Sequence, residues 1–393
     1  MHNKTILISG AGIAGPALAY WLHRHGFAVT VVERAPALRE GGQAVDFRGE
    51  AHLTVLRRMG VLEEIRAAAT HMGEQTVVDA AGRKVVSLPA AFMSGDVEIR
   101  RGDLSRILYE RTRDTTEYVF GDWITSLTET ASGVHATFAH GEAREFDLVV
   151  GADGLHSGVR ALVFGEESRF VRPLGYHVGA FSVPNHLNLD RTGLIYNEPG
   201  RGVILANYGE PGTATAAFFF ETPPLSYDRH DVDQQKKLLM DAFVGVGWET
   251  SRLLSHLPDA TDLYFDAISQ VHMDRFTRGR VALVGDAGYG ATLGGLGTGL
   301  AVVSAYVLAG ELAVAAGDHR VAFPCYEEAI RGYAEECRKV SNSAGPFLAP
   351  PSRSRLWFRN AMYRVLSAPA MSGVFTKLST KSANAITFRN YPL

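Results

Sequence analysis

The first 33 residues change their hydrophobic period twice. Residues 5–9 form a short run of β-branched and apolar side chains, which predicts a buried parallel strand. A stretch with helical periodicity follows and ends at Gly26, a residue type that favours helix termination. Residues 28–32 return to a strand pattern. The chain therefore opens with a predicted β-α-β unit.

Further along, the pattern alternates between short strands and amphipathic helices. Residues 76–88 predict a hairpin around the Ala81-Gly82 turn. A helix is expected to begin near Arg101, capped by Asp103. Other predicted helices are 51–59, 234–243 and 297–312, and other predicted strands are 134–138, 146–150, 265–271 and 281–284. This mixture favours an α/β fold class, with a mostly helical region from 320 to 393.

Residues 170–222 differ from the rest because aromatic side chains alternate with others over several short runs. The pattern predicts a sheet of antiparallel strands, ended by Pro223 and Pro224. Such a sheet is either a covering layer or the wall of a pocket for a flat, apolar ligand. For the second interpretation, the candidate pocket residues are Tyr176, Phe181, Tyr196, Phe218 and Phe220.

Composition limits the possible partners. The chain has 393 residues, 46% of them hydrophobic, which suffices for two or three domains. Its formal net charge of −3 gives no strong field for nucleic acid or an anionic membrane. We expect no membrane span, because no apolar run of about 18 residues is free of polar interruption. Cys325 and Cys337 have the spacing of neither a redox pair nor a usual zinc site, so we expect the cytoplasm and no metal.

The first turn carries the strongest chemical signal. Gly10, Gly12 and Gly15 form G-x-G-x-x-G between the predicted strand and helix. Glycines at these positions permit a tight turn, approach of backbone to a pyrophosphate and close packing of helix on strand, while the helix N-terminus attracts the phosphates. Glu33 follows the second strand and can accept the hydroxyl protons of an adenosine ribose. The motif predicts tightly bound FAD or NAD, and the acid disfavours the 2′-phosphate of NADP.

Two later strands also end in polar or glycine-rich turns. Gly151-Ala-Asp-Gly154 follows one of them, although such an Asp-Gly is most often only a turn. Gly285-Asp286 follows the strand at 281–284, at the edge where open α/β sheets bind ligands. The glycine cluster from 294 to 299 then starts a long helix whose N-terminus would face whatever Asp286 holds.

Some charged residues have a plain structural interpretation. Asp46 and Arg48 lie in a glycine-flanked loop and are equally consistent with a solvated turn that holds its own ion pair. Arginines are frequent in the C-terminal region, and the expectation for them is a solvated face: Arg331, Arg338, Arg353, Arg355, Arg359 and Arg364.

The order of these three strand-end motifs, with Arg101-x-x-Leu104 between the first two, resembles the FAD-dependent group A aromatic monooxygenases. This is the family of para-hydroxybenzoate hydroxylase and the tetracycline-inactivating monooxygenases, and the resemblance covers about residues 4–315. It implies a Rossmann-like FAD-binding domain interleaved with a mixed-sheet substrate domain. The expected division is 1–70, 99–165 and 272–315 for FAD, 71–98 and 166–271 for substrate, and 316–393 for the C-terminal helices.

The resemblance also implies roles for individual residues. Glu33 would hold the adenosine ribose, Arg101 the pyrophosphate and ribityl chain, and Asp286 the ribityl hydroxyls. Asp153 and Gly154 would serve both FAD and a reduced nicotinamide, and Asp46 would lie near the flavin. The full set expected to bind cofactor is Gly10, Gly12, Ala14, Gly15, Glu33, Arg34, Asp46, Arg101, Leu104, Asp153, Gly154, Gly285, Asp286, Gly297, Thr298 and Gly299.

The loop after Asp286 departs from the family pattern. The family has Ala-His, a proline and Gly-x-Gly-x-Asn, whereas this chain has Gly288-Tyr289, no proline before the helix, and Ala301 in place of the asparagine. The residues expected beside the reactive edge of the flavin therefore differ from those of the family. Arg48 and Tyr289 are candidate catalytic residues by position, and each also has a structural or cofactor-binding interpretation.

Three functional hypotheses remain open at this stage. The first is a monooxygenase in which NADH or NADPH reduces FAD and a C4a-hydroperoxyflavin transfers one oxygen to an aromatic or polyketide-like natural product or antibiotic. The second keeps FAD but not oxygen transfer, as in a dehydrogenase, isomerase or cyclase. The third is a protein that sequesters a hydrophobic drug without turnover. The sequence does not decide between a monomer and a homodimer.

Overall fold

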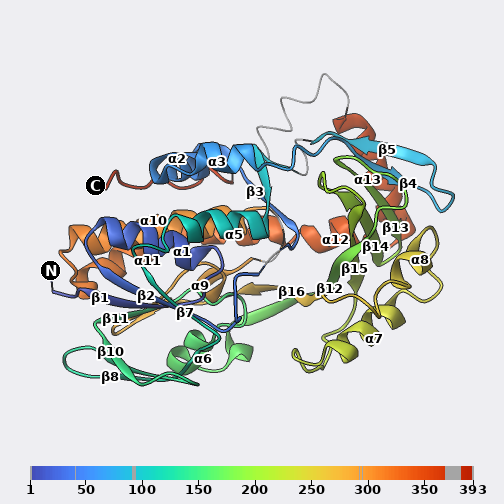
Figure 1. The fold of residues 1–393 in the computed structure, drawn as a ribbon. Helices are drawn as coiled ribbons and strands as arrows, with labels where there is room; N and C mark the ends of the chain where they lie inside the picture. Colours follow the sequence, from blue (N-terminus) through green and yellow to red (C-terminus); the bar gives the residue numbers. More distant parts are fainter. Residues whose placement is uncertain are drawn as a thin grey trace.

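The computed structural model describes residues 2–39, 41–90, 94–291, 293, 295–367 and 382–391. The described chain divides into a half built on a mostly parallel sheet and a half built on a mostly antiparallel sheet (Figure 1). Long helices lie along the first half, and shorter helices flank the second. This is the α/β architecture that the sequence predicts.

The first half is organised around a six-stranded sheet in the order β17-β18-β11-β1-β2-β7. Its central strands are parallel, with Ser9 beside both Val32 and Gly151, and Gly151 beside Leu283. The carboxyl ends of β1, β2, β11 and β18 therefore share one edge. The elements of this half up to residue 164 are β1 (Thr5–Ser9), α1 (Ala14–Arg24), β2 (Ala28–Glu33), β3 (Ala44–Phe47), α2 (Gly49–Met59), α3 (Leu62–Ala67), β6 (Val97–Arg100), α5 (Arg101–Glu110), β7 (Glu117–Phe120), β8 (Ile124–Glu129), β9 (Val134–Phe138), β10 (Arg144–Phe146), β11 (Leu148–Gly151) and α6 (Gly158–Phe164).

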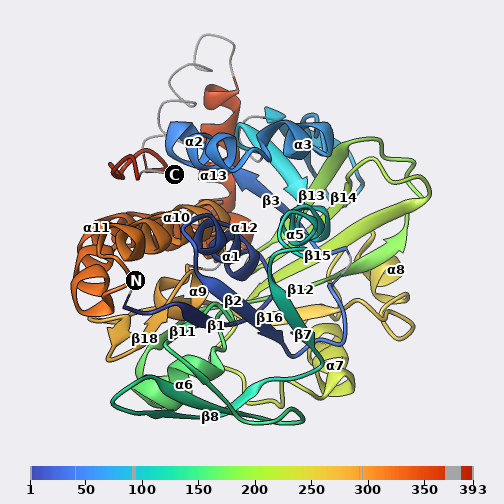
Figure 2. The same ribbon diagram turned by 60° about the vertical axis from the view of Figure 1, so that its left-hand side comes forward.

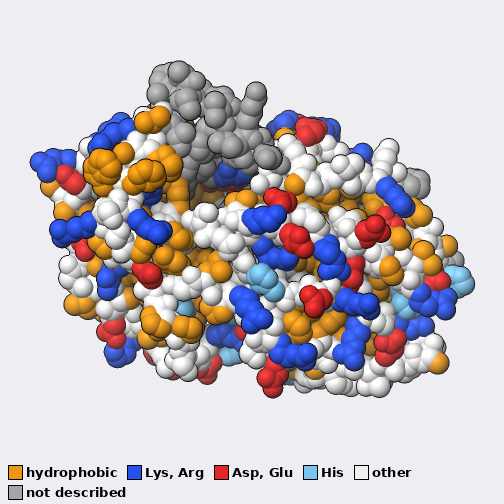
Figure 3. Space-filling model, turned by 180° about the vertical axis from the view of Figure 1, so that it is seen from behind, with side chains coloured by type: hydrophobic (Ala, Val, Ile, Leu, Met, Phe, Trp, Pro, Cys, Tyr) orange, Lys and Arg blue, Asp and Glu red, His pale blue; other side chains and the backbone are white. Residues whose placement is uncertain are grey.

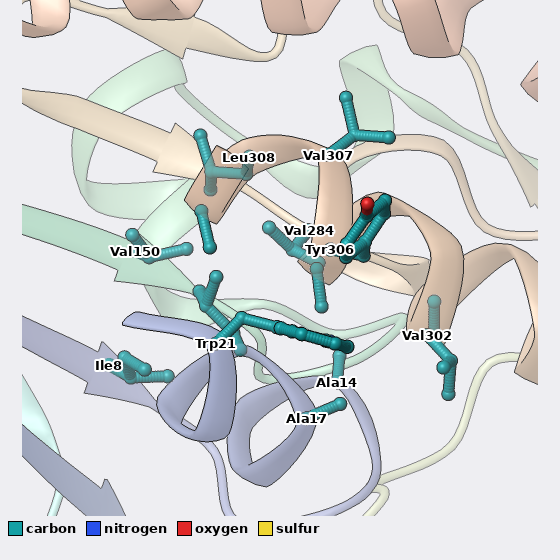
Figure 4. Close-up of a cluster of buried hydrophobic side chains, with 14 of the residues drawn as sticks. Ile8, Ala14, Ala17, Trp21, Val150, Val284, Val302, Tyr306, Val307 and Leu308 are labelled. Carbon is teal, nitrogen blue, oxygen red and sulfur yellow. The ribbon is translucent and has the colours of Figure 1, made fainter. Parts of the chain in front are cut away.

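The chain returns to this half after the second sheet. Its later elements are β17 (Thr277–Arg278), β18 (Val281–Leu283), α9 (Asp286–Tyr289), α10 (Gly297–Val314) and α11 (His319–Ser341). The core forms where α1 and α10 pack together on the sheet, with Trp21, Tyr306 and Val302 interlocked (Figure 4). These side chains are almost completely buried, which makes this contact a main source of hydrophobic stabilisation.

Helix α10 also bears on the expectation of no membrane span. By length and composition it is apolar enough to cross a membrane, yet 78% of its 18-residue window is buried inside the structure. It contacts α1, α2 and α11, and the tail at 382–391 reaches it through Tyr391, whose hydroxyl donates to Glu311 at 2.7 Å. A core helix surrounded on several sides needs no polar face, which accounts for its composition.

The second half is a seven-stranded sheet in the order β16-β12-β15-β14-β13-β4-β5. Its strands come from the two segments predicted for a substrate domain, 71–98 and 166–271, although the domain boundaries stay a prediction. The elements are β4 (Gln75–Val78), β5 (Lys84–Leu88), the short η1 (Glu167–Arg169), β12 (Val171–Pro184), β13 (Thr192–Glu198), β14 (Arg201–Asn207), β15 (Thr213–Glu221), α7 (Val232–Ala242), α8 (Thr250–Leu254) and β16 (Tyr264–Val271).

Helices cover both faces of this second sheet. Side chains of α7 and α8 pack on one face. The other face carries α12 (Ala344–Leu348) and α13 (Arg353–Leu366), and α12 lies between the two halves in Figure 1. Figure 2, turned by 60°, shows α10 and α11 side by side, with α2 beyond them.

Several local predictions need correction. Asp103 lies in the first turn of α5, but Arg100 occupies the N-cap position. The strand predicted at 146–150 is two strands, because Asp147 separates β10 from β11 and accepts hydrogen bonds from the backbone of Lys4 and Thr5. Arg359 is buried rather than solvated, and its guanidinium donates to Phe347 O and Asn197 Oδ1, each at 2.7 Å.

On the face seen from behind, acidic and basic side chains are interspersed rather than separated by sign (Figure 3). This surface agrees with the small formal net charge of −3.

Candidate functional site

The first turn has the geometry that a pyrophosphate requires. Gly10 has φ +107°, and a Cβ there would lie 2.5 Å from Ala152 O. A Cβ on Gly15 would lie 1.9 Å from Gly10 O, so helix and turn are in contact. A Cβ on Gly12, in contrast, would meet nothing within 4 Å. The turn is therefore closed at Gly10 and Gly15 and open at Gly12, the position where the phosphates would approach.

The start of α1 is also suited to an anion. No side chain caps its N-terminus, and its first turn contains no acid. Its free N–H groups and the positive end of its dipole are left for a ligand. Ala14, the first residue of the helix, is buried.

Glu33 lies at the end of β2, and its side chain holds the glycine turn by hydrogen bonds to the backbone. Its Oε2 accepts from Ala11 N at 2.8 Å, and its Oε1 accepts from Ala35 N at 2.9 Å. A carboxylate has about four acceptor positions, so two remain for ribose hydroxyls. The neighbouring Arg34 lies over the ring of Trp123, 4.8 Å from its centroid.

Asp286 follows β18 at the same edge, and its side chain is exposed there. The protein packed around its carboxyl displaces water and so raises its pKa. The charge of Arg101 opposes that rise. A Cβ on Gly297 would lie 3.8 Å from Asp286 Oδ1, so the first residue of α10 is beside the carboxylate. Helix α10 has no side-chain cap at its N-terminus. An exposed acid, a cation and a free helix start therefore converge at this edge.

Helix α5 connects the two ends of this edge. Arg101 begins the helix and is exposed, and its backbone N–H donates to Gln43 O at 3.1 Å. Leu104, expected to bind cofactor, is instead fully buried in the core. The contact with the glycine turn comes from the next residue, since Ser105 Oγ donates to Gly12 O at 3.1 Å. No pattern in the sequence pointed to Ser105.

Asp153 holds the Asp-Gly loop in place. Its carboxylate accepts from Ser157 Oγ at 2.5 Å and from Val159 N at 3.1 Å, and more weakly from Ser9 Oγ at 3.3 Å. Burial raises its pKa, and these bonds counteract the rise. Gly154 has φ +79° with nothing within 4 Å of a Cβ, so the loop is open beside a well-anchored acid.

Sequence reasoning missed two residues in this region, Arg160, which is fully buried, and His156, which is half-buried. The guanidinium of Arg160 is fully buried and donates to Ala287 O at 2.9 Å and Leu155 O at 2.6 Å, which ties the Asp-Gly loop to the residue after Asp286. His156 lies between Glu167 and Asp266, 3.0 Å from each, and these carboxylates raise its pKa to about 9 against the effect of burial. The local sequence around His156 cannot predict its contact with Asp266, which lies 110 residues away in the chain.

The expected cofactor residues at and near the start of α10 fall into two groups, those open to a ligand and those used in packing. Gly297 and Thr298 are half-buried at the free helix start, as a ligand contact requires. Gly299 serves packing instead, because a Cβ there would lie 2.0 Å from the ring of His52 on α2. Gly285 also serves close packing, with a Cβ position 3.3 Å from that of Ala301.

The two catalytic candidates lie in different surroundings. Tyr289 is buried, its hydroxyl is 2.6 Å from that of Tyr326, and burial raises its pKa to about 12. Tyr326 in turn donates to Leu283 O at 2.9 Å. Tyr289 therefore joins α9 to α11 inside the core, which supports its structural interpretation, while a catalytic role stays an untested prediction. Arg48 forms an ion pair with Asp46 near the loop into α10.

The expectation that aromatic residues of the second sheet line a substrate pocket needs a larger correction. Phe181, Tyr196, Phe218 and Phe220 are buried in a cluster with the side chains of α7 and α8, such as Phe243. They form the hydrophobic core of that face and do not line a pocket. Strand alternation explains the error, because it groups residues by face without showing which face a helix covers.

The opposite face of the sheet is turned toward α12 and the FAD-binding half. Its apolar cluster contains Tyr176, Val178, Phe219 and Ile268, with Leu293 from the loop before α10 packed against it. Tyr176 is the one candidate pocket residue on this face, and a Cβ on Gly345 of α12 would lie 2.4 Å from its ring. This face, and not the one under α7, lies beside the loop that follows Asp286.

The comparisons with known proteins agree with this geometry. A family model described as FAD binding domain matches residues 3–344. The chain belongs to this family, the FAD-dependent group A monooxygenases. The open position at Gly12, the free starts of α1 and α10, and the exposed Asp286 beside Arg101 fit the diphosphate and polyhydroxyl parts of FAD.

Relatives of similar length share the family. An uncharacterized protein of Mycobacterium tuberculosis is 45% identical over 88% of this chain and 95% of its own. A flavin-dependent monooxygenase of Legionella longbeachae is 39% identical over 86% of this chain and 87% of its own. The crystal structure of the tetracycline destructase Tet(55) superposes with a TM-score of 0.85 at 38% identity, and covers 99% of both chains. The described part of the chain thus has the fold of the FAD-dependent monooxygenases.

Proposed function

We propose that this FAD-dependent monooxygenase uses NADH or NADPH and O2 to insert one oxygen atom into a hydrophobic aromatic or polyketide-like natural product or antibiotic. Its overall likeness to Tet(55), at 38% identity over 99% of both chains, is the observation that carries this substrate class. Bound FAD would supply the electron transfer and oxygen activation, since these reactions belong to the cofactor. The protein supplies binding, orientation and exclusion of water.

The residues assigned to FAD have distinct tasks in this proposal. Gly12 and the start of α1 would hold the pyrophosphate, and Glu33 the adenosine ribose. Asp286 and Arg101 would hold the ribityl chain and its phosphate. The start of α10 would stabilise negative charge at the nearby flavin edge by about 1 kcal/mol.

The substrate would lie against the face of the second sheet that carries Phe219 and Leu293. No separate domain in the described residues is devoted to a nicotinamide, so we propose that the reductant docks transiently. We also propose the cytoplasm as the compartment, in keeping with two free cysteines, Cys325 and Cys337.

The test is a purified, FAD-loaded protein supplied with NADH or NADPH and a panel of aromatic compounds that includes tetracycline. We expect a flavin spectrum, faster oxidation of the nicotinamide in the presence of a substrate, and a product heavier by one oxygen atom. Asp286→Asn should weaken FAD binding without unfolding the protein, because the side chain is exposed. Glu145→Gln, an exposed change on β10, is the matched control.

Each negative outcome has a distinct meaning. A flavoprotein whose nicotinamide oxidation no compound stimulates would contradict the monooxygenase proposal and favour chemistry without oxygen transfer. Protein that binds tetracycline tightly but consumes no nicotinamide would favour sequestration. Equal FAD affinity in the wild type and Asp286→Asn would contradict the placement of the ribityl chain.

A further inference from the structure

Helix α13 turns polar side chains inward and large apolar side chains outward. Arg359 and Asn360 are buried against the second sheet, whereas Trp357 and Phe358 are 69% and 65% exposed. A helix on a protein surface ordinarily does the opposite, because burial of its apolar face stabilises the fold and its charges are better hydrated in water. The outward side of α13 is therefore not explained by the packing of this chain.

The inward side fixes α13 on the second sheet. The guanidinium of Arg359 donates to Asn197 Oδ1 of β13 at 2.7 Å. Tyr363 is buried among apolar side chains of β4, β5 and β13. At the end of the helix, Ser367 Oγ donates to Ser87 O of β5 at 2.7 Å. These contacts hold the helix in one orientation, so its outward side is a permanent surface of the folded protein.

The outward apolar side chains form one stripe along the helix. At about 3.6 residues per turn, positions 357, 358, 361, 362 and 365 lie on the same side of a helix. The exposed large apolar residues of α13 occupy four of these positions: Trp357, Phe358, Met362 and Val365. In Figure 3 hydrophobic side chains gather at the upper left, the end of the molecule where α13 lies, with basic side chains beside them. Single exposed apolar residues are common, but a contiguous group marks an interaction site.

Basic side chains border the stripe on both sides. By the same helical spacing, Arg353 and Arg364 lie along one side of it and Arg355 along the other. All three are exposed, and none forms an ion pair with another residue in the part of the chain that the structure describes. Helix α13 contains no acidic residue. An apolar stripe between two rows of cations is the pattern of a helix that lies in the headgroup region of a lipid bilayer.

We propose that the outward side of α13 docks this protein on an anionic phospholipid surface. Trp357 and Phe358 enter the boundary between headgroups and acyl chains, and the three bordering arginines contact lipid phosphates. The formal net charge of the chain is −3, so the attraction is local to this helix. A second copy of the chain fits this face less well, because two α13 helices packed together would oppose arginines with no acid from either helix to pair with them.

The first test measures sedimentation of the FAD-loaded protein with vesicles and needs no turnover. One set of vesicles is phosphatidylcholine, and the other contains phosphatidylcholine and phosphatidylglycerol. We expect binding to the anionic vesicles alone, and release at high salt because salt screens the arginines. Replacement of both Trp357 and Phe358 by Ser should weaken binding at least tenfold, since it removes the apolar contact. Arg364→Gln should weaken binding about fivefold.

Two matched controls lie on the opposite side of the second sheet. Val244→Ser, after α7, changes an apolar residue that is 78% exposed. Arg252→Gln removes an exposed cation from α8. Both should bind anionic vesicles like the wild type. Thermal denaturation should show every variant as stable as the wild type, because all the changed side chains are exposed.

Tryptophan fluorescence tests whether α13 is the part that touches lipid. Among the four tryptophans, Trp357 is exposed, Trp21 is buried, and Trp123 and Trp248 are half-buried. Anionic vesicles should therefore shift the emission of the wild type to shorter wavelength. Trp357→Phe should remove this shift and still bind, because phenylalanine keeps the apolar contact.

Three results would overturn the proposal. They are no binding to anionic vesicles, equal binding by the wild type and the double Ser variant, and an undiminished emission shift in Trp357→Phe. Dimers in sedimentation velocity that the double Ser variant separates into monomers would also overturn it, and would place a second copy of the chain on α13. All of these readouts are independent of whether the protein transfers oxygen.

Discussion

At the scale of single residues, three glycines in the first turn perform different tasks. Gly10 adopts a positive φ, Gly15 contacts the turn at a separation that a Cβ would not allow, and Gly12 borders open space. The same residue type thus serves the fold at two positions, and we propose that it serves the ligand at the third. Substitutions at Gly12 and Gly15 should separate these tasks.

We expect Gly12→Ala to leave the apoprotein stable and to weaken FAD binding, because the added methyl group fills the space for the pyrophosphate. Gly15→Ala should lower the free energy of unfolding by about 3 kcal/mol, since its Cβ would lie 1.9 Å from Gly10 O. Thermal denaturation of the apoproteins and fluorescence titration with FAD measure the two effects. Equal destabilisation by both substitutions would contradict this division.

Tyr289 gives a second test at the residue scale. Tyr289→Phe removes one buried hydroxyl from the pair with Tyr326. We expect a loss of about 1 kcal/mol in the free energy of unfolding and no change in FAD affinity. Urea denaturation and FAD titration provide the readouts. Unchanged stability with impaired nicotinamide oxidation would favour the catalytic interpretation of Tyr289.

At the scale of elements, β15 shows how strand alternation assigns side chains to opposite faces. Phe218 and Phe220 pack under α7 and α8, whereas Phe219 packs toward α12. The sequence predicted the sheet and its aromatic character, but it gave no information on which face is covered by α7. That choice depends on where helices 232–242 and 250–254 dock.

Phe218→Ala and Phe219→Ala should therefore differ in their consequences. We expect Phe218→Ala to destabilise the protein by about 3–5 kcal/mol with little change in KM, because Phe218 is completely buried in a core. Phe219→Ala should raise KM for a substrate that the protein oxidises. Denaturation curves and steady-state kinetics are the measurements. A raised KM in a well-folded Phe218→Ala variant would place the substrate on the α7 face.

At the scale of the whole molecule, buried and half-buried charges join the two halves. His156, from the loop after β11, lies between Glu167 and Asp266 of β16, and Arg160 ties the same loop to Ala287. These contacts connect the Asp-Gly loop, the loop after β18 and the substrate sheet. They fix the relative position of two strand-end motifs that are more than 120 residues apart in the chain.

The His156 contacts should make stability depend on pH. The pKa of His156 is raised from 6.5 to about 9, so its charged form stabilises the folded state fully below pH 6.5 and the contribution is lost as pH rises toward 9. Between pH 7 and 9 the free energy of unfolding should fall by about 2 kcal/mol less in His156→Gln than in the wild type. This figure allows for the partial exposure of His156. Thermal denaturation across this range measures it. The same pH dependence in both proteins would contradict the assignment.

The sequence by itself determined the order of strands and helices, the glycine turn and the three strand-end motifs, because these depend on local periodicity and backbone conformation. The glycine motif predicted Glu33, the end of a strand predicted Asp286, and the family resemblance predicted Asp153. Parallel strands bring all three acids to one edge of the sheet. Only the tertiary structure decided the surroundings of His156, Arg160 and the phenylalanines of β15. Their surroundings come from segments distant in the chain, and burial, charge pairing and the choice of face are properties of those distant contacts.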